Sequence, residues 1–186
     1  MERSQTRKYE EYAYVLDFVV RGKSTTVRGR DGIIVTALGE ERLTILELLA
    51  MPNSTFEIGE RVYIGKEGRT KILSVLGRLE FAQTSSSAQS ELGSVVEKIV
   101  IQNEQRFIDY LNNAQPLTPR IHALELIPGI GKTYMKTMLE EREKRKFSDF
   151  KDLQERVGLK EPAKQIAKRI LEEITGETRM NLFVRK

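Results

Sequence analysis

Residues 123–143, ALELIPGIGKTYMKTMLEERE, place the tetrapeptide PGIG between two short stretches with a helical spacing of apolar residues. Gly129 suits a tight reversal, because glycine adopts positive φ without a Cβ clash. The isoleucine after it can point inward between the two helices. Gly131 leaves room for another molecule at the N-terminus of the next helix, where unpaired N–H groups and the helix dipole favour an anion. With Lys132 beside it, this turn predicts a phosphate-binding site.

This pattern resembles the helix-hairpin-helix, whose signature is an apolar residue, Pro or another residue, Gly, an apolar residue and Gly between two short helices. The similarity continues over FSDFKDLQERVGLKEPAKQIAKRILEEI, residues 147–174. That segment is similar to the second half of tandem modules of the competence-protein type. The second hairpin departs from the pattern, because Lys160 stands where the second glycine would be.

The resemblance implies that backbone amides of the hairpin contact phosphates without reading sequence, usually across a duplex minor groove. The residues expected to bind phosphate are Gly129, Ile130, Gly131, Lys132 and Thr133, with supporting charges on Lys136, Lys160 and Lys164. The resemblance also implies K+ or Na+ on the backbone carbonyls of Glu125, Ile127 and Ile130. The residues alone leave another interpretation open, in which PGIG is a turn in a module that contacts proteins.

Four short helices are expected in the C-terminal part of the chain, over residues 118–126, 132–145, 148–157 and 162–174. The first is predicted by Thr118-Pro119, an N-cap residue followed by proline at the first helical position. We expect one helix-hairpin-helix domain over residues 113–176 and a basic tail over residues 177–186. Residues 118–186 hold 16 basic and 11 acidic residues, whereas the whole chain has a net charge of +4. The basic excess therefore lies in this part, as a polyanion-binding region requires.

A Ser-rich segment, residues 83–93, precedes this domain. It contains the run TSSSAQS, which has no apolar residue larger than alanine. Such a composition is typical of flexible linkers. Ser94 and Glu97 then match a capping box, so we expect one amphipathic connecting helix over residues 94–112.

The first eighty residues predict strands. Short apolar or alternating runs, separated by turn-like segments, occur at residues 12–20, 33–38, 43–49, 61–65 and 71–81. Five strands at this spacing indicate a small closed barrel over residues 1–82, and FEIGERVYIG (56–65) resembles the fourth strand of an OB-fold. The expected fold class is therefore α+β with segregated parts, an OB-like β-barrel followed by an α-helical tandem helix-hairpin-helix domain.

The barrel adds a second expectation about binding. OB-folds hold single strands by stacking bases on aromatic side chains in a basic groove. Tyr14 and Tyr63 are the stacking candidates here, whereas Phe18 and Phe81 are expected to fill the core.

Composition excludes several kinds of chemistry. The 186-residue chain has no cysteine and one histidine, His122, which excludes disulfides, thiolate nucleophiles, Cys-based zinc sites and paired-imidazole metal sites. Many carboxylates alternate with Lys and Arg, as on a solvated helix face, so we expect no enzyme. The charged first residues and the lack of a long apolar run predict a cytoplasmic protein with neither a membrane span nor a secretory signal.

The assembled pattern resembles an uncharacterised archaeal family of predicted nucleic-acid-binding proteins. It predicts a non-catalytic, largely sequence-nonspecific nucleic-acid binder, with no cofactor except K+ or Na+ at the hairpin and a single-strand contribution from the barrel. RNA is preferred to DNA because a barrel beside a duplex-gripping module suits structured RNA with exposed loops. A protein-interaction adaptor is the alternative, and an enzyme with unrecognised carboxylate chemistry is third.

Overall fold

The structure is a computed structural model that describes residues 9–186. The first eight residues of the expected barrel domain lie outside the described residues. The chain is mixed α/β and divides into two units, the first reaching to Val95 and including Phe183–Lys186, the second comprising Val96–Leu182. Within the described part, no helix is long and apolar enough to cross a membrane.

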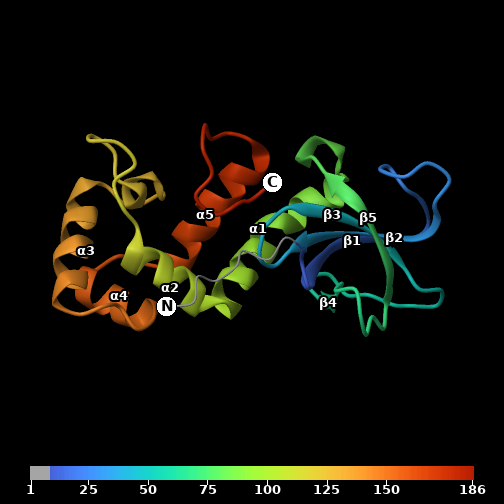
Figure 1. Cartoon of the computed structure of the whole chain (residues 1–186), viewed down its shortest axis with the longest axis horizontal. Coiled ribbons are helices and arrows are strands. Elements are labelled where there is room, and N and C mark those ends of the chain that lie inside the picture. Colours follow the sequence, from blue (N-terminus) through green and yellow to red (C-terminus); the bar gives the residue numbers. More distant parts are fainter. Residues whose placement is uncertain (1–8) are drawn as a thin grey trace. The chain divides into compact units, whose positions relative to one another are not determined.

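The first unit is built on one antiparallel sheet. Its strands are β1 (Tyr12–Lys23), β2 (Asp31–Gly39), β3 (Ile45–Ala50), β4 (Arg61–Tyr63) and β5 (Ile72–Leu79). Their spatial order is β4-β1-β2-β3-β5 (Figure 1). These strands lie where the sequence predicts strands.

The sheet is a curled half-barrel, so the prediction of a closed barrel is wrong. Register shifts in β1, between Val15 and Asp17 and between Val19 and Gly22, are bulges, which bend a strand and increase its twist. The sheet nevertheless ends at β4 and β5, which form its two edges. Strand β4 spans only three residues and pairs with β1, which leaves little backbone for a closing ladder.

Apolar side chains from all five strands, together with Phe56 and Ile64 in the loops on either side of β4, form the core of this unit. They are Ala13, Val15, Val35, Ala37, Leu46, Leu48, Ala50, Phe56, Val62, Ile64 and Ile72. Alternate residues of β1 and β2 contribute, as the two-residue period of a strand requires. Strand β3 is buried along its whole length.

One carboxylate lies inside this sheet. Glu47 in β3 is 2% exposed, and it accepts hydrogen bonds from the loop between β1 and β2. The donors are the backbone N–H groups of Thr25 (2.9 Å) and Thr26 (3.1 Å) and the hydroxyls of Ser24 and Thr26. Burial alone would raise the pKa of Glu47, but these hydrogen bonds outweigh it and hold the pKa below its usual value. Glu47 is therefore an ionised residue that anchors the loop.

The Ser-rich segment is helical, so the linker prediction is wrong. After the short 3-10 helix η1 (Phe81–Gln83), the chain forms α1 (Ser86–Gln102). The hydroxyl of Ser85 accepts the N–H of Ala88 at 3.1 Å, which is how serine starts a helix. Ala88 and Leu92 are buried, so this segment has an apolar face despite its polar composition.

The expected single connecting helix is also wrong, because two helices replace it. Helix α1 extends to Gln102, and α2 (Glu104–Asn113) begins after Asn103. Ser94 lies inside α1, where its hydroxyl donates to the carbonyl of Glu91 at 3.2 Å instead of capping a helix.

The second unit contains three further helices at the places that the sequence predicts. They are α3 (Lys132–Lys144), α4 (Phe150–Val157) and α5 (Pro162–Thr175). Asp149 caps α4 by accepting the N–H of Asp152, and α4 packs between α3 and α5.

Residues 118–126 are not an α-helix. The hydroxyl of Thr118 accepts the N–H groups of Arg120 (3.2 Å) and Ile121 (3.0 Å), and these bonds close a tight turn. Only the 3-10 helix η2 (Ala123–Leu126) follows. Proline suits the second position of a turn as well as the first position of a helix, and here the local hydrogen bonds select the turn.

The end of the chain is not a free basic tail. Phe183 and Val184 are buried, and the N–H of Arg185 donates to the carbonyl of Arg42 at 2.9 Å. The last four residues thereby belong to the first unit.

A buried ion pair on α5 supports the start of the PGIG turn. Arg169 and Glu173 are 6% and 2% exposed, and Arg169 Nε donates to Glu173 Oε2 at 2.9 Å. The other guanidinium nitrogens donate to the carbonyls of Leu126 (3.3 Å) and Met180 (2.8 Å). Glu173 also accepts the N–H of Leu182 at 3.0 Å. One side chain therefore holds the end of η2 and the segment after α5.

Removing this guanidinium should destabilise the second unit, because Glu173 would be left buried and uncompensated. We expect Arg169→Ala to lower the free energy of unfolding by about 3–5 kcal/mol, measured by urea denaturation. Lys168→Ala, at the exposed neighbouring position, is the matched control and should stay within about 0.5 kcal/mol of the parent. Parental stability of Arg169→Ala would contradict the anchoring role.

Replacing Glu47 by glutamine should cost about 1–3 kcal/mol of stability near neutral pH, because an amide presents N–H groups to backbone donors. A carboxylate whose folded pKa is lowered stabilises the fold above its ordinary pKa, and this contribution disappears as pH falls through the lowered pKa. The stability difference between parent and Glu47→Gln should therefore shrink in urea titrations at progressively acidic pH.

The exposed carboxylate of Glu57 offers the control for this experiment. Glu57→Gln should leave the stability nearly unchanged. A stability difference for Glu47→Gln that persists in strong acid would mean that the charge of Glu47 is not what anchors the loop.

Candidate functional site

The PGIG turn, residues 128–131, joins η2 to α3 by successive tight turns. The N–H of Ile127 donates to the carbonyl of Leu124 (3.2 Å), and the N–H of Ile130 donates to the carbonyl of Ile127 (3.1 Å). The side chain of Ile130 is buried. The inward position predicted for this isoleucine is confirmed.

Gly129 is required at this turn by its backbone conformation. Its φ is +80°, in the left-handed region that favours glycine. A Cβ at this position would also lie 2.8 Å from Cδ of Gln165 on α5. The close approach means that α5 lies against the PGIG turn at Gln165.

Gly131 is the N-cap residue of α3 and has a different property. Its φ of −81° and ψ of −176° are open to any residue, and within the described chain no atom beyond its neighbours lies within 4 Å of a Cβ built there. No side chain of the described residues caps α3, and Lys132, Thr133 and Tyr134 are exposed. The first N–H groups of α3 therefore face open space at the positive end of the helix dipole.

The predicted supporting lysines lie on exposed positions. Lys136 is one turn along α3 from Lys132, and Lys160 lies in the loop between α4 and α5. Lys164 is in the first turn of α5, next to Gln165. Its Nζ is 3.0 Å from Glu161 Oε1, and this hydrogen bond raises the pKa of Lys164. The charge of Lys164 is therefore partly offset.

The second turn, residues 158–161, differs from the first. Gly158 ends α4 with φ +83°, and Leu159 is buried. Pro162 lacks an N–H group and Glu161 places a carboxylate at the start of α5. This N-terminus offers fewer donors and carries a negative charge, so it suits phosphate less well than the start of α3.

The carbonyls named for a monovalent cation belong to the PGIG turn and to η2. The Ile127 carbonyl accepts the N–H of Ile130, and a second lone pair remains on this oxygen. No cluster of His, Asp or Glu side chains in the described part is arranged to hold a metal ion. The cation at Glu125, Ile127 and Ile130 stays a prediction.

The stacking prediction is wrong for Tyr14. Its side chain is fully buried, and its hydroxyl donates to Glu40 Oε2 at 2.9 Å. Arg61 also binds Glu40, at 2.7 Å and 3.0 Å. Burial raises the pKa of Tyr14 to about 12, and the hydrogen bond to Glu40 adds to this rise. A ring enclosed in this way cannot stack on a base.

Tyr63 differs from Tyr14 because it is only half-buried. Its ring meets the ring of Tyr12 edge to face, with centroids 5.3 Å apart. Arg61 covers the ring of Tyr12 at 3.5 Å from its centroid. Tyr63 remains a candidate for stacking.

The sequence analysis did not identify the structural role of two residues that position the PGIG turn. His122 is buried, and its Nδ1 accepts the N–H of Leu124 at 3.0 Å, which starts η2. Burial lowers the pKa of His122, in keeping with this neutral acceptor role. The other residue is Arg169, and its signal was available: Arg169 and Glu173 lie four residues apart among the apolar positions of α5.

Comparisons with known proteins identify relatives over nearly the whole chain. A family described as protein of unknown function (DUF655) matches residues 9–185. The uncharacterized protein MJ0038 of Methanocaldococcus jannaschii is 42% identical over 183 residues, which cover 98% of this chain and 82% of that protein. The crystal structure of Af1531 from Archaeoglobus fulgidus, also described as DUF655, is 37% identical with a TM-score of 0.83, covering 95% of this chain and 100% of that one. The chain therefore belongs to the DUF655 family of uncharacterised archaeal proteins.

Proposed function

We propose that this protein binds nucleic acid without catalysis and largely without sequence preference, through backbone N–H groups of the PGIG turn and the start of α3. The observation that carries this proposal is the open space over Gly131, at a helix N-terminus without a side-chain cap. In this proposal residues 113–176 act as a tandem helix-hairpin-helix domain, with the first turn binding and the second supporting.

Phosphate is the ligand that suits this end of α3 best. Backbone N–H groups form charge-assisted hydrogen bonds with phosphate oxygens, and the helix dipole adds to the attraction. Lys132 and Thr133 extend from the same exposed turn and supply an ammonium and a hydroxyl. Because amides contact phosphates and not base edges, binding by this turn does not select a sequence.

The charges around the turn favour a polyanion over a small anion. Lys136 follows Lys132 by one turn, and the contact of Gln165 with Gly129 brings the start of α5, with Lys164, next to the PGIG turn. Lys160 and Lys168 are exposed on the loop and helix that flank it. Several cations on neighbouring segments can each neutralise a phosphate of one backbone.

The curled sheet has a second role in this proposal. We infer that it acts as an OB-like module that contributes to single-strand binding, with Tyr63 and not Tyr14 as the stacking residue. RNA that combines duplex and loop would use both modules, which is the basis for a preference for RNA over DNA.

The buried carboxylates support a binding role over carboxylate catalysis. A general acid or base needs access to its substrate and a pKa near the working pH. Glu47 is buried with a lowered pKa. One carboxylate oxygen of Glu173 accepts hydrogen bonds from both Arg169 and Leu182. Both residues have structural partners.

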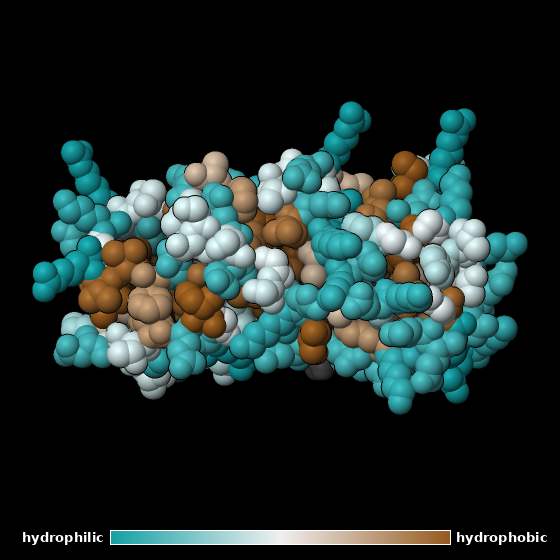
Figure 2. All heavy atoms as spheres, turned by 180° about the vertical axis from the view of Figure 1, so that it is seen from behind, coloured by the Kyte–Doolittle hydropathy of each residue, from teal (hydrophilic) through white to brown (hydrophobic). Residues whose placement is uncertain are grey.

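The face of the molecule drawn in Figure 2 supports a charged ligand over an adaptor role. An adaptor is expected to present a large contiguous apolar patch. On the face drawn in Figure 2, apolar residues occur in separate places among polar and charged ones.

Replacing Gly131 by aspartate provides the sharpest test, because it should raise stability and abolish binding. Aspartate is a better N-cap than glycine by a few tenths of a kcal/mol, and the backbone here accepts it without strain. The same carboxylate would occupy the amides and repel phosphate. We expect Gly131→Asp to lose binding of a 20-base-pair duplex, RNA or DNA, in fluorescence anisotropy at low salt.

Two further variants measure how much smaller changes at the PGIG turn weaken duplex binding. Gly131→Ala adds only a methyl group in open space, so its fold should be unaffected and any loss of affinity reports a close backbone approach by the ligand. Lys132→Ala should cost about 1 kcal/mol of binding and reduce the slope of log affinity against log salt by about one phosphate.

Gln154→Glu adds the same negative charge as Gly131→Asp at an exposed position of α4, and it should keep most of the parental affinity. The proposal fails if Gly131→Asp folds normally and binds the duplex as tightly as the parent. PGIG would then be only a turn, and the adaptor role would become the better explanation. Parallel titration of RNA and DNA of one sequence tests the preference for RNA.

A further inference from the structure

A concave surface lies in the first unit, between the two edges of the curled sheet. It is a cavity of about 890 Å³ whose walls come from the segment before β1, the β2–β3 loop, both edge strands and the end of the chain. Pockets that hold small ligands typically measure about 300–1,000 Å³. The cavity is therefore large enough for a nucleotide.

The walls of this cavity carry a strong excess of positive charge. Five lining residues are cationic and two, Glu10 and Glu11, are acidic. The carboxylate of Glu10 is already turned to the backbone, where it accepts the N–H groups of Glu41 and Arg42. The cavity therefore attracts an anion.

The cations differ in how firmly they are held. The guanidinium of Arg69 donates to the carbonyls of Ile64, Gly65 and Leu73 at distances of 2.7–3.2 Å, so it is a structural clamp. By contrast, the side chains of Arg42 and Arg78 have no carboxylate partner among residues 9–186. Their charges remain available to a ligand.

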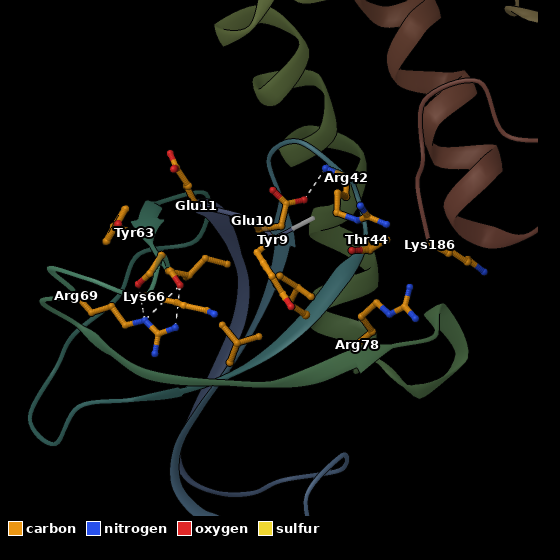
Figure 3. Close-up of a pocket in the computed structure, with 14 residues that line it drawn as sticks. Tyr9, Glu10, Glu11, Arg42, Thr44, Tyr63, Lys66, Arg69, Arg78 and Lys186 are labelled. Carbon is orange, nitrogen blue, oxygen red and sulfur yellow. Dashed lines mark hydrogen bonds between the residues drawn. The ribbon is translucent and has the colours of Figure 1, made fainter. Parts of the chain in front are cut away.

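An aromatic ring occupies the middle of the cavity. Tyr9 is 63% exposed, and in Figure 3 it lies between Arg42 and Arg78 on one side and Tyr63 and Lys66 on the other. The ammonium of Lys66 is 4.9 Å from the centre of the Tyr9 ring. A planar base stacks on such a ring, and stacking of this kind tolerates any base.

We propose that this cavity binds a phosphorylated nucleotide, with the base against Tyr9 and the phosphate between Arg42 and Arg78. Free nucleotides and the phosphorylated end of a single strand share this chemistry. The inference deepens the single-strand contribution proposed for the sheet by naming its site and ligand. It is independent of the PGIG turn, whose ligand is a backbone phosphate.

The test is isothermal titration of the full chain with AMP, ATP, adenosine and inorganic triphosphate. We expect ATP and AMP to bind and adenosine to bind at least about tenfold more weakly, since charge-assisted bonds supply the difference. The double variant Arg42→Gln/Arg78→Gln should weaken ATP binding by about tenfold or more. Tyr9→Ala should weaken binding of ATP but not of inorganic triphosphate, because only the base uses the ring.

Arg28→Gln is the matched control, since Arg28 is an exposed arginine of the same unit that does not line the cavity. It should bind ATP like the parent. Gly131→Asp should also bind ATP like the parent, so loss of duplex binding and loss of nucleotide binding report the two sites separately. Thermal unfolding checks that the cavity variants remain folded.

Short oligonucleotides with and without a 5′-phosphate identify the source of the nucleotide. Tighter binding of the phosphorylated oligonucleotide, lost in the double variant, would show that the cavity holds a strand end. Binding of free nucleotides alone would show a nucleotide pocket. The proposal is overturned if no phosphorylated ligand binds at millimolar concentration, or if Arg42→Gln/Arg78→Gln and Arg28→Gln reduce binding equally.

Discussion

Because Gly129 holds φ at +80° beneath the side chain of Gln165, the chain reverses between η2 and α3 within the four residues of the PGIG turn. Every other feature of this turn depends on that reversal. It buries Ile130, it aims the first N–H groups of α3 outward, and it brings α5 against the turn. A residue with a Cβ would hold a strained backbone at this position and would also push aside the end of the Gln165 side chain.

Buried charges hold together segments that are distant in the sequence. Arg169 joins α5 to the end of η2 and to the segment near Met180, and Glu47 joins β3 to the β1–β2 loop. A buried ion must have its partners satisfied to be tolerated at all, so each of these residues dictates the place of the loops around it. Arg169 thereby fixes the backbone that leads into the PGIG turn, and Glu47 fixes the loop between β1 and β2.

In our proposals, the two units offer anions two different kinds of surface. The start of α3 presents backbone amides over open space, which suits a chain of phosphates that approaches from outside. The cavity of the first unit presents a tyrosine ring and arginine side chains around a hollow, which suits one nucleotide with its base. The difference follows from architecture, because a helix terminus is convex whereas a half-barrel leaves a gap between its edge strands.

Local patterns in the sequence determined the local structure. Alternating apolar residues specified the strands, and caps, glycines and helical spacing specified α3, α4 and α5, because these signals act within a few residues. The PGIG turn and the exposure of Lys132 followed from the same short-range chemistry.

Only the tertiary structure decided what depends on distant partners. The Ser-rich start of α1 is helical because Ala88 and Leu92 are buried. Tyr14 cannot stack on a base because its ring is buried and its hydroxyl is bonded to Glu40, 26 residues away in the sequence. The sheet stays open because β4 is short. The charged residues that line its cavity come from segments that are far apart in the sequence. Burial is a property of the packed chain, and a residue type alone does not reveal which face it will cover.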